Sequence, residues 1–402
     1  MSDVLQLLVV LMIILVVAKG SGLASSAIGQ PAVLGELLAG VVLGPSIVNL
    51  FGASFLDSPY IEENTHLLAE LGVIFLMFLA GLETDLGEVN RVRRVAFLAG
   101  SIGVLVPVVM GAGASVPFGF STKECIFIGI ILSATSVSIS ARTLMELNVL
   151  QQRQGLAILA AAVIDDVLGL IVLSFFIAFA VEGSGGGGAT DAMLIVVRVA
   201  VFFAAAFIAG RFVLPPLMRW AGNAPMSEGV LATAIVVVLF YAWFAEYFGA
   251  VAAITGAFMA GLFLRQTEAH RLIDERARAL AYGFFVPIFF VAVGLSANAR
   301  DIQGPDALLL AVVFLVAVVS KVAGCGLGAL LGGEPPRSAL QIGTGMISRG
   351  EVGLIMATVG LNKGIIATDV YSIVVLTVLA TTLATPLLLR IVFPRQKEAR
   401  YA

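Results

Sequence analysis

The sequence predicts an all-α polytopic membrane protein, on the evidence of its composition and of its recurring apolar runs. Of its 402 residues, 60% are hydrophobic and only 12% are charged, whereas a soluble domain is about half apolar and about a quarter charged. Apolar runs recur along the whole chain, each close to the roughly 20 residues that cross a bilayer core. The sequence shows no phosphate loop, metal-ligand cluster or extended basic patch, so we expect no enzyme activity, no cofactor and no nucleic-acid partner.

We expect thirteen transmembrane helices, separated by short loops. Their predicted limits are 3–19, 26–45, 66–82, 95–115, 126–146, 155–180, 193–214, 229–247, 249–265, 283–297, 306–332, 338–360 and 369–393. The longest predicted loops are 46–65 and 266–282. Membrane lipid is therefore the expected surrounding of most of the chain.

The distribution of Lys and Arg predicts the orientation of these helices. No basic residue precedes the first apolar run and Lys19 follows it, which argues for a retained helix with an external N-terminus rather than a signal peptide. With thirteen crossings, most basic residues outside the spans then lie in cytoplasmic loops, and Lys123, Arg300 and Lys363 lie outside. Because cytoplasmic loops are enriched in Lys and Arg, this sorting supports the count and places the C-terminus in the cytoplasm.

Six spans precede a Gly-rich external linker (183–192), and six follow the connecting helix (193–214). Two halves of six spans, separated by one crossing, match an inverted repeat. The fifth and twelfth spans then correspond, and small and hydroxylated residues interrupt both, over 132–140 and 343–353. Such residues also allow close helix packing, but interruptions at matching positions favour a binding site at the membrane midplane.

Two adjacent carboxylates, Asp165 and Asp166, lie about midway along the sixth span. An ionisable group at this depth costs about 2.5–3.5 kcal/mol on the insertion scale, so it usually has a function and a partner. Neighbours on a helix point about 100° apart, so one acid can face a wet cavity while the other meets Lys321 of the eleventh span. A static Asp165–Lys321 pair that only joins helices is the alternative, but it leaves Asp166 unexplained.

Arg349 and Glu351 flank the interruption of the twelfth span. They could bind each other, brace the interruption, or reach Glu70 in the third span. Since buried charges must be paired whatever they do, we expect a structural role for all three residues.

Six motifs resemble, in family order, those of monovalent cation/proton antiporters, in the branch of NapA-type sodium/proton antiporters and Kef-type potassium systems. They include "GQPAVLGELLAGVVLGPS" (29–46), "AAAVIDDVLGL" (160–170) and "SRGEVGLI" (348–355). The resemblance covers nearly the full length. Kef-type systems usually have Gln–Asp at the acidic pair and a large cytosolic domain; this chain has Asp165 at the first position and almost no tail, which disfavours the potassium reading.

The resemblance implies that Asp166 binds the cation, that Asp165 pairs with Lys321, and that Ser133, Thr135 and Ser136 lie beside the ion. It also implies a homodimer and two kinds of domain. Scaffold and dimerisation helices would occupy 1–92 and 215–304, core transport helices 93–182 and 305–394, and a cytoplasmic tail 395–402.

The expected function is exchange of Na⁺ or Li⁺ for H⁺ by alternating access in a prokaryotic plasma membrane, with transported ions as the only ligands. A carboxylate in a wet midplane cavity holds either a proton or a cation, and sodium displacing Lys321 from Asp165 would make exchange electrogenic. A K⁺/H⁺ antiporter and a passive cation channel remain alternatives. A sodium symporter is disfavoured by the competing Lys321, and an intramembrane aspartic protease because both acids lie on one helix.

Overall fold

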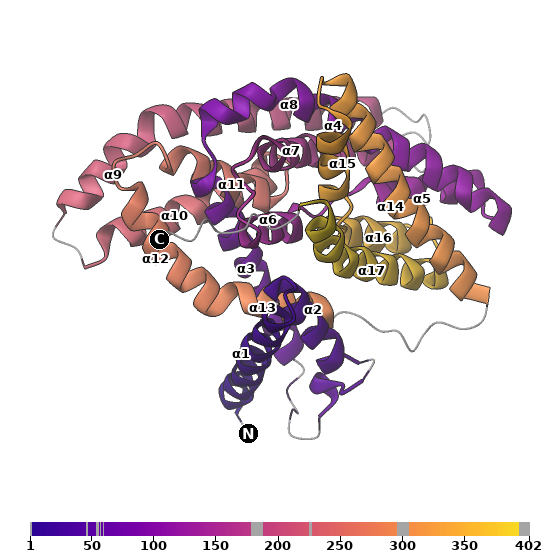
Figure 1. Cartoon of the computed structure of the whole chain (residues 1–402), viewed down its shortest axis with the longest axis horizontal. Coiled ribbons are helices and arrows are strands. Elements are labelled where there is room, and N and C mark those ends of the chain that lie inside the picture. The colour runs from indigo at the N-terminus through magenta and orange to yellow at the C-terminus, as the bar shows by residue number, and fades with distance from the viewer. Residues whose placement is uncertain are drawn as a thin grey trace.

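The computed structural model describes residues 2–45, 47–53, 56, 58, 60–177, 188–224, 227–295 and 305–393, and the long regular elements in these ranges are all helices (Figure 1). The α-helices are α1 (Asp3–Ala27), α2 (Ala32–Leu43), α3 (Ile61–Glu83), α4 (Leu86–Ser115), α5 (Thr122–Ser133), α6 (Val137–Glu146), α7 (Arg153–Phe176), α8 (Gly188–Ile208), α9 (Leu214–Asn223), α10 (Gly229–Trp243), α11 (Ala253–Leu264), α12 (His270–Leu280), α13 (Val286–Leu295), α14 (Pro305–Leu331), α15 (Pro336–Gly345), α16 (Glu351–Asn362) and α17 (Thr368–Val392). Single π-helical turns join α8 to α9 and α12 to α13, and a third, η5 (Phe244–Phe248), follows α10.

Within these described ranges, ten helices are long and apolar enough to cross a membrane, by length and composition. Three shorter apolar helices, at Ala32–Leu43, Ala253–Leu264 and Val352–Leu361, accompany them. The predicted polytopic helical fold is therefore confirmed. The count of thirteen crossings and the inverted repeat stay predictions. Of the predicted Gly-rich linker (183–192), residues 183–187 lie outside the described residues, whereas residues 188–192 are not a linker but the start of α8.

Several predicted limits are wrong. The predicted loop 266–282 contains helix α12, which continues through a π turn into α13. The polar side chains of α12 hid it from a search for apolar runs, because only one narrow face, carrying Ile273 and Ala277, is buried. Helix α1 extends to Ala27 rather than ending at residue 19, and the seventh span continues to Asn223, because Pro215 and Pro216 lie in the first turn of α9, where proline is tolerated.

The helices pack in two groups (Figure 1). Helix α4 lies against α14, α5 and α7, while α3 lies against α11 and α13. Glycines allow the closest approaches: a Cβ on Gly328 of α14 would collide with the Leu98 carbonyl of α4, and one on Gly261 of α11 with the Phe78 carbonyl of α3. Small residues at such contacts let helix backbones touch, which is the main source of packing energy between helices in lipid.

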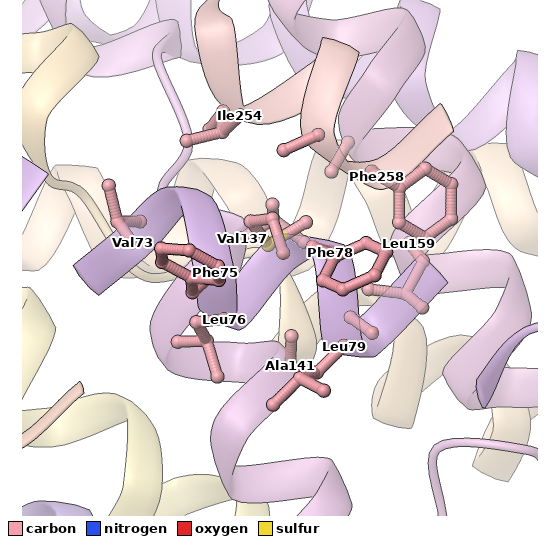
Figure 2. Close-up of a cluster of buried hydrophobic side chains, with 14 of the residues drawn as sticks. Val73, Phe75, Leu76, Phe78, Leu79, Val137, Ala141, Leu159, Ile254 and Phe258 are labelled. Atoms are coloured by element: carbon pink, nitrogen blue, oxygen red, sulfur yellow. The ribbon is translucent and has the colours of Figure 1, made fainter. Parts of the chain in front are cut away.

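A cluster of buried apolar side chains joins the two groups (Figure 2). Phe78 and Leu79 of α3 and Phe258 of α11 face Val137 of α6 and Leu159 of α7 across this cluster. All five are less than a tenth exposed, so this layer is a buried apolar contact between the helices that it joins.

Candidate ion-binding site

The two interrupted spans meet each other. Helix α5 ends at Ser133 and α6 begins at Val137, while α15 ends at Gly345 and α16 begins at Glu351. Between the helical halves the backbone is extended, and the Ser136 amide donates a hydrogen bond of 2.8 Å to the Ser348 carbonyl. The Ser140 hydroxyl also donates to the Gly345 carbonyl, at 2.6 Å. Both predicted interruptions are present, and they lie side by side.

Helix α7 places its two acids in different surroundings. The Asp165 Oδ1 atom lies 2.5 Å from Lys321 Nζ of α14, and the two side chains are 1% and 0% exposed. The other oxygen, Oδ2, has no hydrogen-bond partner in the described part of the chain. The pair predicted from sequence therefore forms, between two completely buried and opposite charges.

Asp166 points to a different neighbour. It is 6% exposed, and its Oδ2 atom accepts a hydrogen bond of 3.4 Å from the Thr255 hydroxyl of α11. The sequence analysis missed Thr255. The available signal was a single hydroxyl in the apolar run "AVAAITGAFMAGL", which is too common a feature of membrane helices to identify a site alone.

The three predicted hydroxyl residues differ in what their oxygens do. The Thr135 hydroxyl is buried beside the Asp165 carboxylate and makes no hydrogen bond of normal geometry among the described residues. The Ser133 hydroxyl donates to the Ile130 carbonyl of its own helix, at 2.7 Å, and the Ser136 hydroxyl lies 2.9 Å from that of Ser138. Of these three hydroxyls, only that of Thr135 has no hydrogen bond of normal geometry in the described ranges.

Arg349 braces the crossing. Its Nη2 atom donates to the Leu132 carbonyl at the end of α5, at 2.7 Å, and to the Ala317 carbonyl of α14, at 2.8 Å. Its Nη1 atom donates to the Ile347 carbonyl. The guanidinium is 0% exposed, and its bonds to Leu132 and Ile347 satisfy carbonyls at the two interruptions, as backbone outside the helical ladder requires at this depth.

The other two predicted support residues are placed differently. The side chain of Glu351 lies outside the described residues. Glu70 is exposed and lines a cavity with His66 and Glu246, and the described residues show no ion pair between Glu70 and Arg349.

This cavity, of about 470 Å³, lies between α3, α11 and α13 on one side and α7, α16 and α17 on the other. Its walls include Leu170, one turn beyond Asp166, Ile254, next to Thr255, and Gly350, at the interruption before α16. The cavity thus reaches from exposed Glu70 to the neighbourhood of Asp166.

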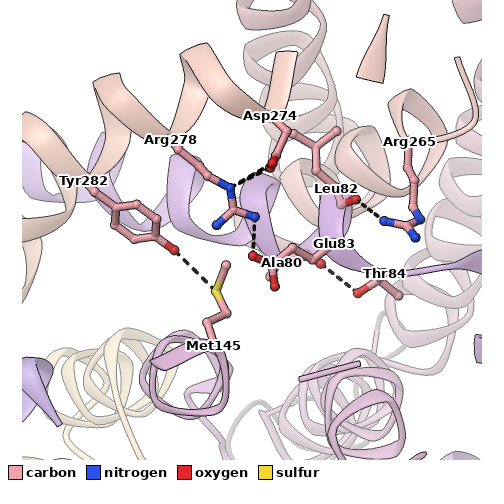
Figure 3. Close-up of polar contacts among 9 residues, drawn as sticks. All are labelled: Ala80, Leu82, Glu83, Thr84, Met145, Arg265, Asp274, Arg278 and Tyr282. Atoms are coloured by element: carbon pink, nitrogen blue, oxygen red, sulfur yellow. Dashed lines mark hydrogen bonds and ion pairs between the residues drawn. The ribbon is translucent and has the colours of Figure 1, made fainter. Parts of the chain in front are cut away.

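A second, polar pocket of about 650 Å³ lies at the opposite end of α3, where Leu82 and Glu83 line it. There Arg278 pairs with Glu83 and, at 2.9 Å, with Asp274, and the Tyr282 hydroxyl donates to the sulfur of Met145, at 3.5 Å (Figure 3). Along α3, the apolar cluster of Figure 2 separates this pocket from the first cavity.

The last turn of α6 makes further contacts across this end. Arg142 stacks over the ring of Tyr282, 4.2 Å from its centre, and the Glu146 Oε2 atom accepts a hydrogen bond of 2.7 Å from the Ala32 amide of α2. These contacts connect α6 to α2 and to the turn before α13 at the end of the molecule that carries the polar pocket.

A buried carboxylate beside two crossing, interrupted helices is the arrangement of secondary transporters. The sequence profile described as "Sodium/hydrogen exchanger, transmembrane" matches residues 10–393. The chain belongs to this family.

Relatives and solved structures agree with this assignment. The chain is 36% identical to the Na(+)/H(+)-K(+) antiporter GerN of Bacillus cereus, over 97% of each chain, and 35% identical to a Na(+)/H(+) antiporter of Enterococcus hirae, over 95% of this chain and 96% of the other. The solved structure of the sodium proton antiporter MjNhaP1 from Methanocaldococcus jannaschii superimposes with a TM-score of 0.69, at 16% identity over 96% of each chain. This last likeness concerns the fold.

We predict that Arg349→Ala strongly destabilises the protein, because it removes the hydrogen bonds to the buried Leu132 and Ile347 carbonyls at the interruptions, each worth about 1–3 kcal/mol when its partner is left unsatisfied. Thermal unfolding in detergent, followed by tryptophan fluorescence, measures the loss. The control is Arg91→Ala, which removes an exposed ion pair with Glu88 and should leave the melting temperature nearly unchanged. Equal melting temperatures for the two variants would contradict the bracing role.

Proposed function

We propose that the chain exchanges Na⁺, or Li⁺, for H⁺ across the membrane by alternating access, with Asp166 as the site that both ions use. The observation that carries this proposal is a nearly buried carboxylate one helical turn from a residue of the cavity wall, beside two interrupted helices, in a member of the sodium/hydrogen exchanger family. In surroundings of low polarity an ionised carboxylate must be neutralised. A proton does this, and so does a monovalent cation, but one site does not hold both.

The residues near Asp166 suit a small, hard cation. Sodium binds carboxylate, hydroxyl and carbonyl oxygens, and the crossing supplies the last two kinds. The Thr135 hydroxyl makes no regular hydrogen bond among the described residues, and the segments around Ser136 and Ser348 place backbone carbonyls outside helices. In this proposal Asp166 and Thr135 are ligands, Ser133 and Ser136 shape the segment that presents Thr135, and Arg349 and Glu351 support the crossing.

In the Asp165–Lys321 pair, the charged Lys321 side chain carries a second proton. If sodium at Asp166 draws Asp165 towards it, Lys321 loses the partner that keeps it charged, and a desolvated ammonium releases its proton. More than one proton then crosses for each sodium, so exchange moves net charge. A membrane potential of 100 mV acts on each elementary charge with about 2.3 kcal/mol, which makes such exchange sensitive to voltage.

The two packing groups suggest which parts move. We assign residues 93–182 and 305–394 to a moving core and residues 1–92 and 215–304 to a scaffold. With thirteen crossings, two inverted repeats and an external N-terminus, the cavity at Glu70 opens outside and the polar pocket at Glu83 faces the cytoplasm. The apolar cluster of Figure 2 then blocks the inward path. A homodimer in a plasma membrane, formed through the scaffold, completes this proposal.

Potassium is the second candidate cation, because a relative is named for both Na⁺ and K⁺. The acidic pair and its buried lysine favour sodium. Proteoliposomes loaded with a pH-sensitive dye and challenged with Na⁺, Li⁺ and K⁺ in turn decide between the cations. Cation flux without proton movement would instead identify a passive channel.

We predict that Asp166→Asn abolishes sodium-driven proton movement in these proteoliposomes, because an amide neither releases a proton nor neutralises a cation. The matched control is Glu62→Gln, which alters an exposed acid in the first turn of α3 and should retain activity. Exchange by Asp166→Asn at the rate of the unmodified protein would overturn the proposed site.

We also predict that Lys321→Gln, if it transports, responds little or not at all to membrane potential, because it removes the second proton carrier. Valinomycin and potassium gradients set the potential, and the initial rate of exchange is the readout. A voltage response equal to that of the unmodified protein would show that Lys321 carries no proton.

A further inference from the structure

Thr255 is the residue through which the proposed scaffold touches the ion site. It lies in the first turn of α11, whereas Asp166 lies on α7 of the proposed core. Both side chains are nearly buried, at 2% and 6% exposed, and the Thr255 hydroxyl lies 3.4 Å from Asp166 Oδ2. By contrast, Thr135, Ser133, Ser136 and Lys321 all belong to core segments and would move together with Asp166.

We infer that Thr255 is a positioning residue that completes the ion site only in the state described here, with the cavity at Glu70 open. The inference rests on the proposed function, since it assumes that the core moves against the scaffold. A hydrogen bond weakens steeply beyond about 3.5 Å. The contact is already 3.4 Å long, so a displacement of even a few ångströms between α7 and α11 breaks it.

The contact between Thr255 and Asp166 favours one protonation state of the carboxylate. A hydroxyl that donates to Asp166 stabilises the ionised carboxylate, which is the form that binds sodium, over the protonated form. The first turn of α11 adds to this effect, since the N-terminal end of a helix carries partial positive charge. After the core has moved, Asp166 lacks the hydroxyl and binds protons more readily. Thr255 therefore makes the affinity for sodium higher from the cavity side than from the opposite side.

The structure also explains why the contact lies at this point. The chain leaves the helical conformation between η5 and α11, where Ala250 adopts a left-handed φ of 53°. Ala250, Val251, Ala252 and Ala253 line the cavity, so this short connection brings the start of α11 to the level of Asp166. Thr255 is thereby buried directly below the cavity wall.

The test is the Michaelis constant for sodium, measured separately from each face of the membrane in right-side-out and inside-out vesicles. Thr255→Val replaces the hydroxyl by a methyl group of similar size. It should raise the constant on the cavity side by about three- to tenfold, the factor that one ordinary hydrogen bond contributes. The maximal rate and the constant on the opposite side should change little. Thr255→Ser keeps the hydroxyl and should behave as the unmodified protein.

The matched control is Thr65→Val on α3. Thr65 is also buried, but its hydroxyl donates only to the Ile61 carbonyl of its own helix, so neither constant should change. Glu62→Cys, at an exposed position, identifies the cavity face when it is labelled with an impermeant maleimide. Cys125 and Cys325 should not react with the label, because both are buried. An equal rise on both faces, no rise, or a Thr255→Ser variant that behaves like Thr255→Val would overturn the inference.

Asp166→Asn separates this inference from the proposed function. If that variant still exchanges sodium for protons, the proposed site itself is wrong. If it is inactive while Thr255→Val is unchanged on both faces, Asp166 remains the site and only the role of Thr255 fails.

Discussion

The cost of burying charge inside a membrane governs this structure. Three ionisable side chains, Asp165, Lys321 and Arg349, are almost completely buried, where an unpaired charge is strongly unfavourable. Asp165 and Lys321 neutralise each other at 2.5 Å, and Arg349 is surrounded by backbone carbonyls. These contacts join α7, α14 and the two interrupted spans around the crossing.

Asp166 is the exception that gives the protein its function in our account. The Thr255 hydroxyl donates to it at 3.4 Å, and it lies one turn from Leu170 in the wall of a cavity that Glu70 and Glu246 also line. A cation drawn to that cavity finds the carboxylate next. Along α3, the buried layer of Phe78, Leu79 and Phe258 lies between this cavity and the polar pocket at Glu83. Two pockets separated by a buried apolar layer fit the alternating access of our proposal.

Sequence patterns predicted the parts of the site in which a residue is energetically unfavourable in its own membrane segment. Acids at mid-span and runs of Ser, Thr and Gly inside apolar helices violate the usual composition of a membrane segment, so Asp165, Lys321 and both interruptions were visible. Features that depend on contacts between helices far apart in the sequence could not be predicted. Helix α12 was hidden by its polar face, and Thr255 gained significance only when folding brought α11 against α7. Glu70 lines the cavity and does not pair with Arg349 in the described part of the chain. This position depends on how α3 packs against the other helices, so the sequence did not predict it.

Equilibrium binding of radioactive sodium to the purified protein, over a series of pH values, tests the central claim most directly. If a proton and sodium compete for Asp166, protonation at low pH removes the sodium site. The apparent dissociation constant should then increase by up to about tenfold for each unit of pH on the acidic side, and added sodium should release protons into weakly buffered solution. A dissociation constant that is the same at every pH, with no proton release, would contradict the account.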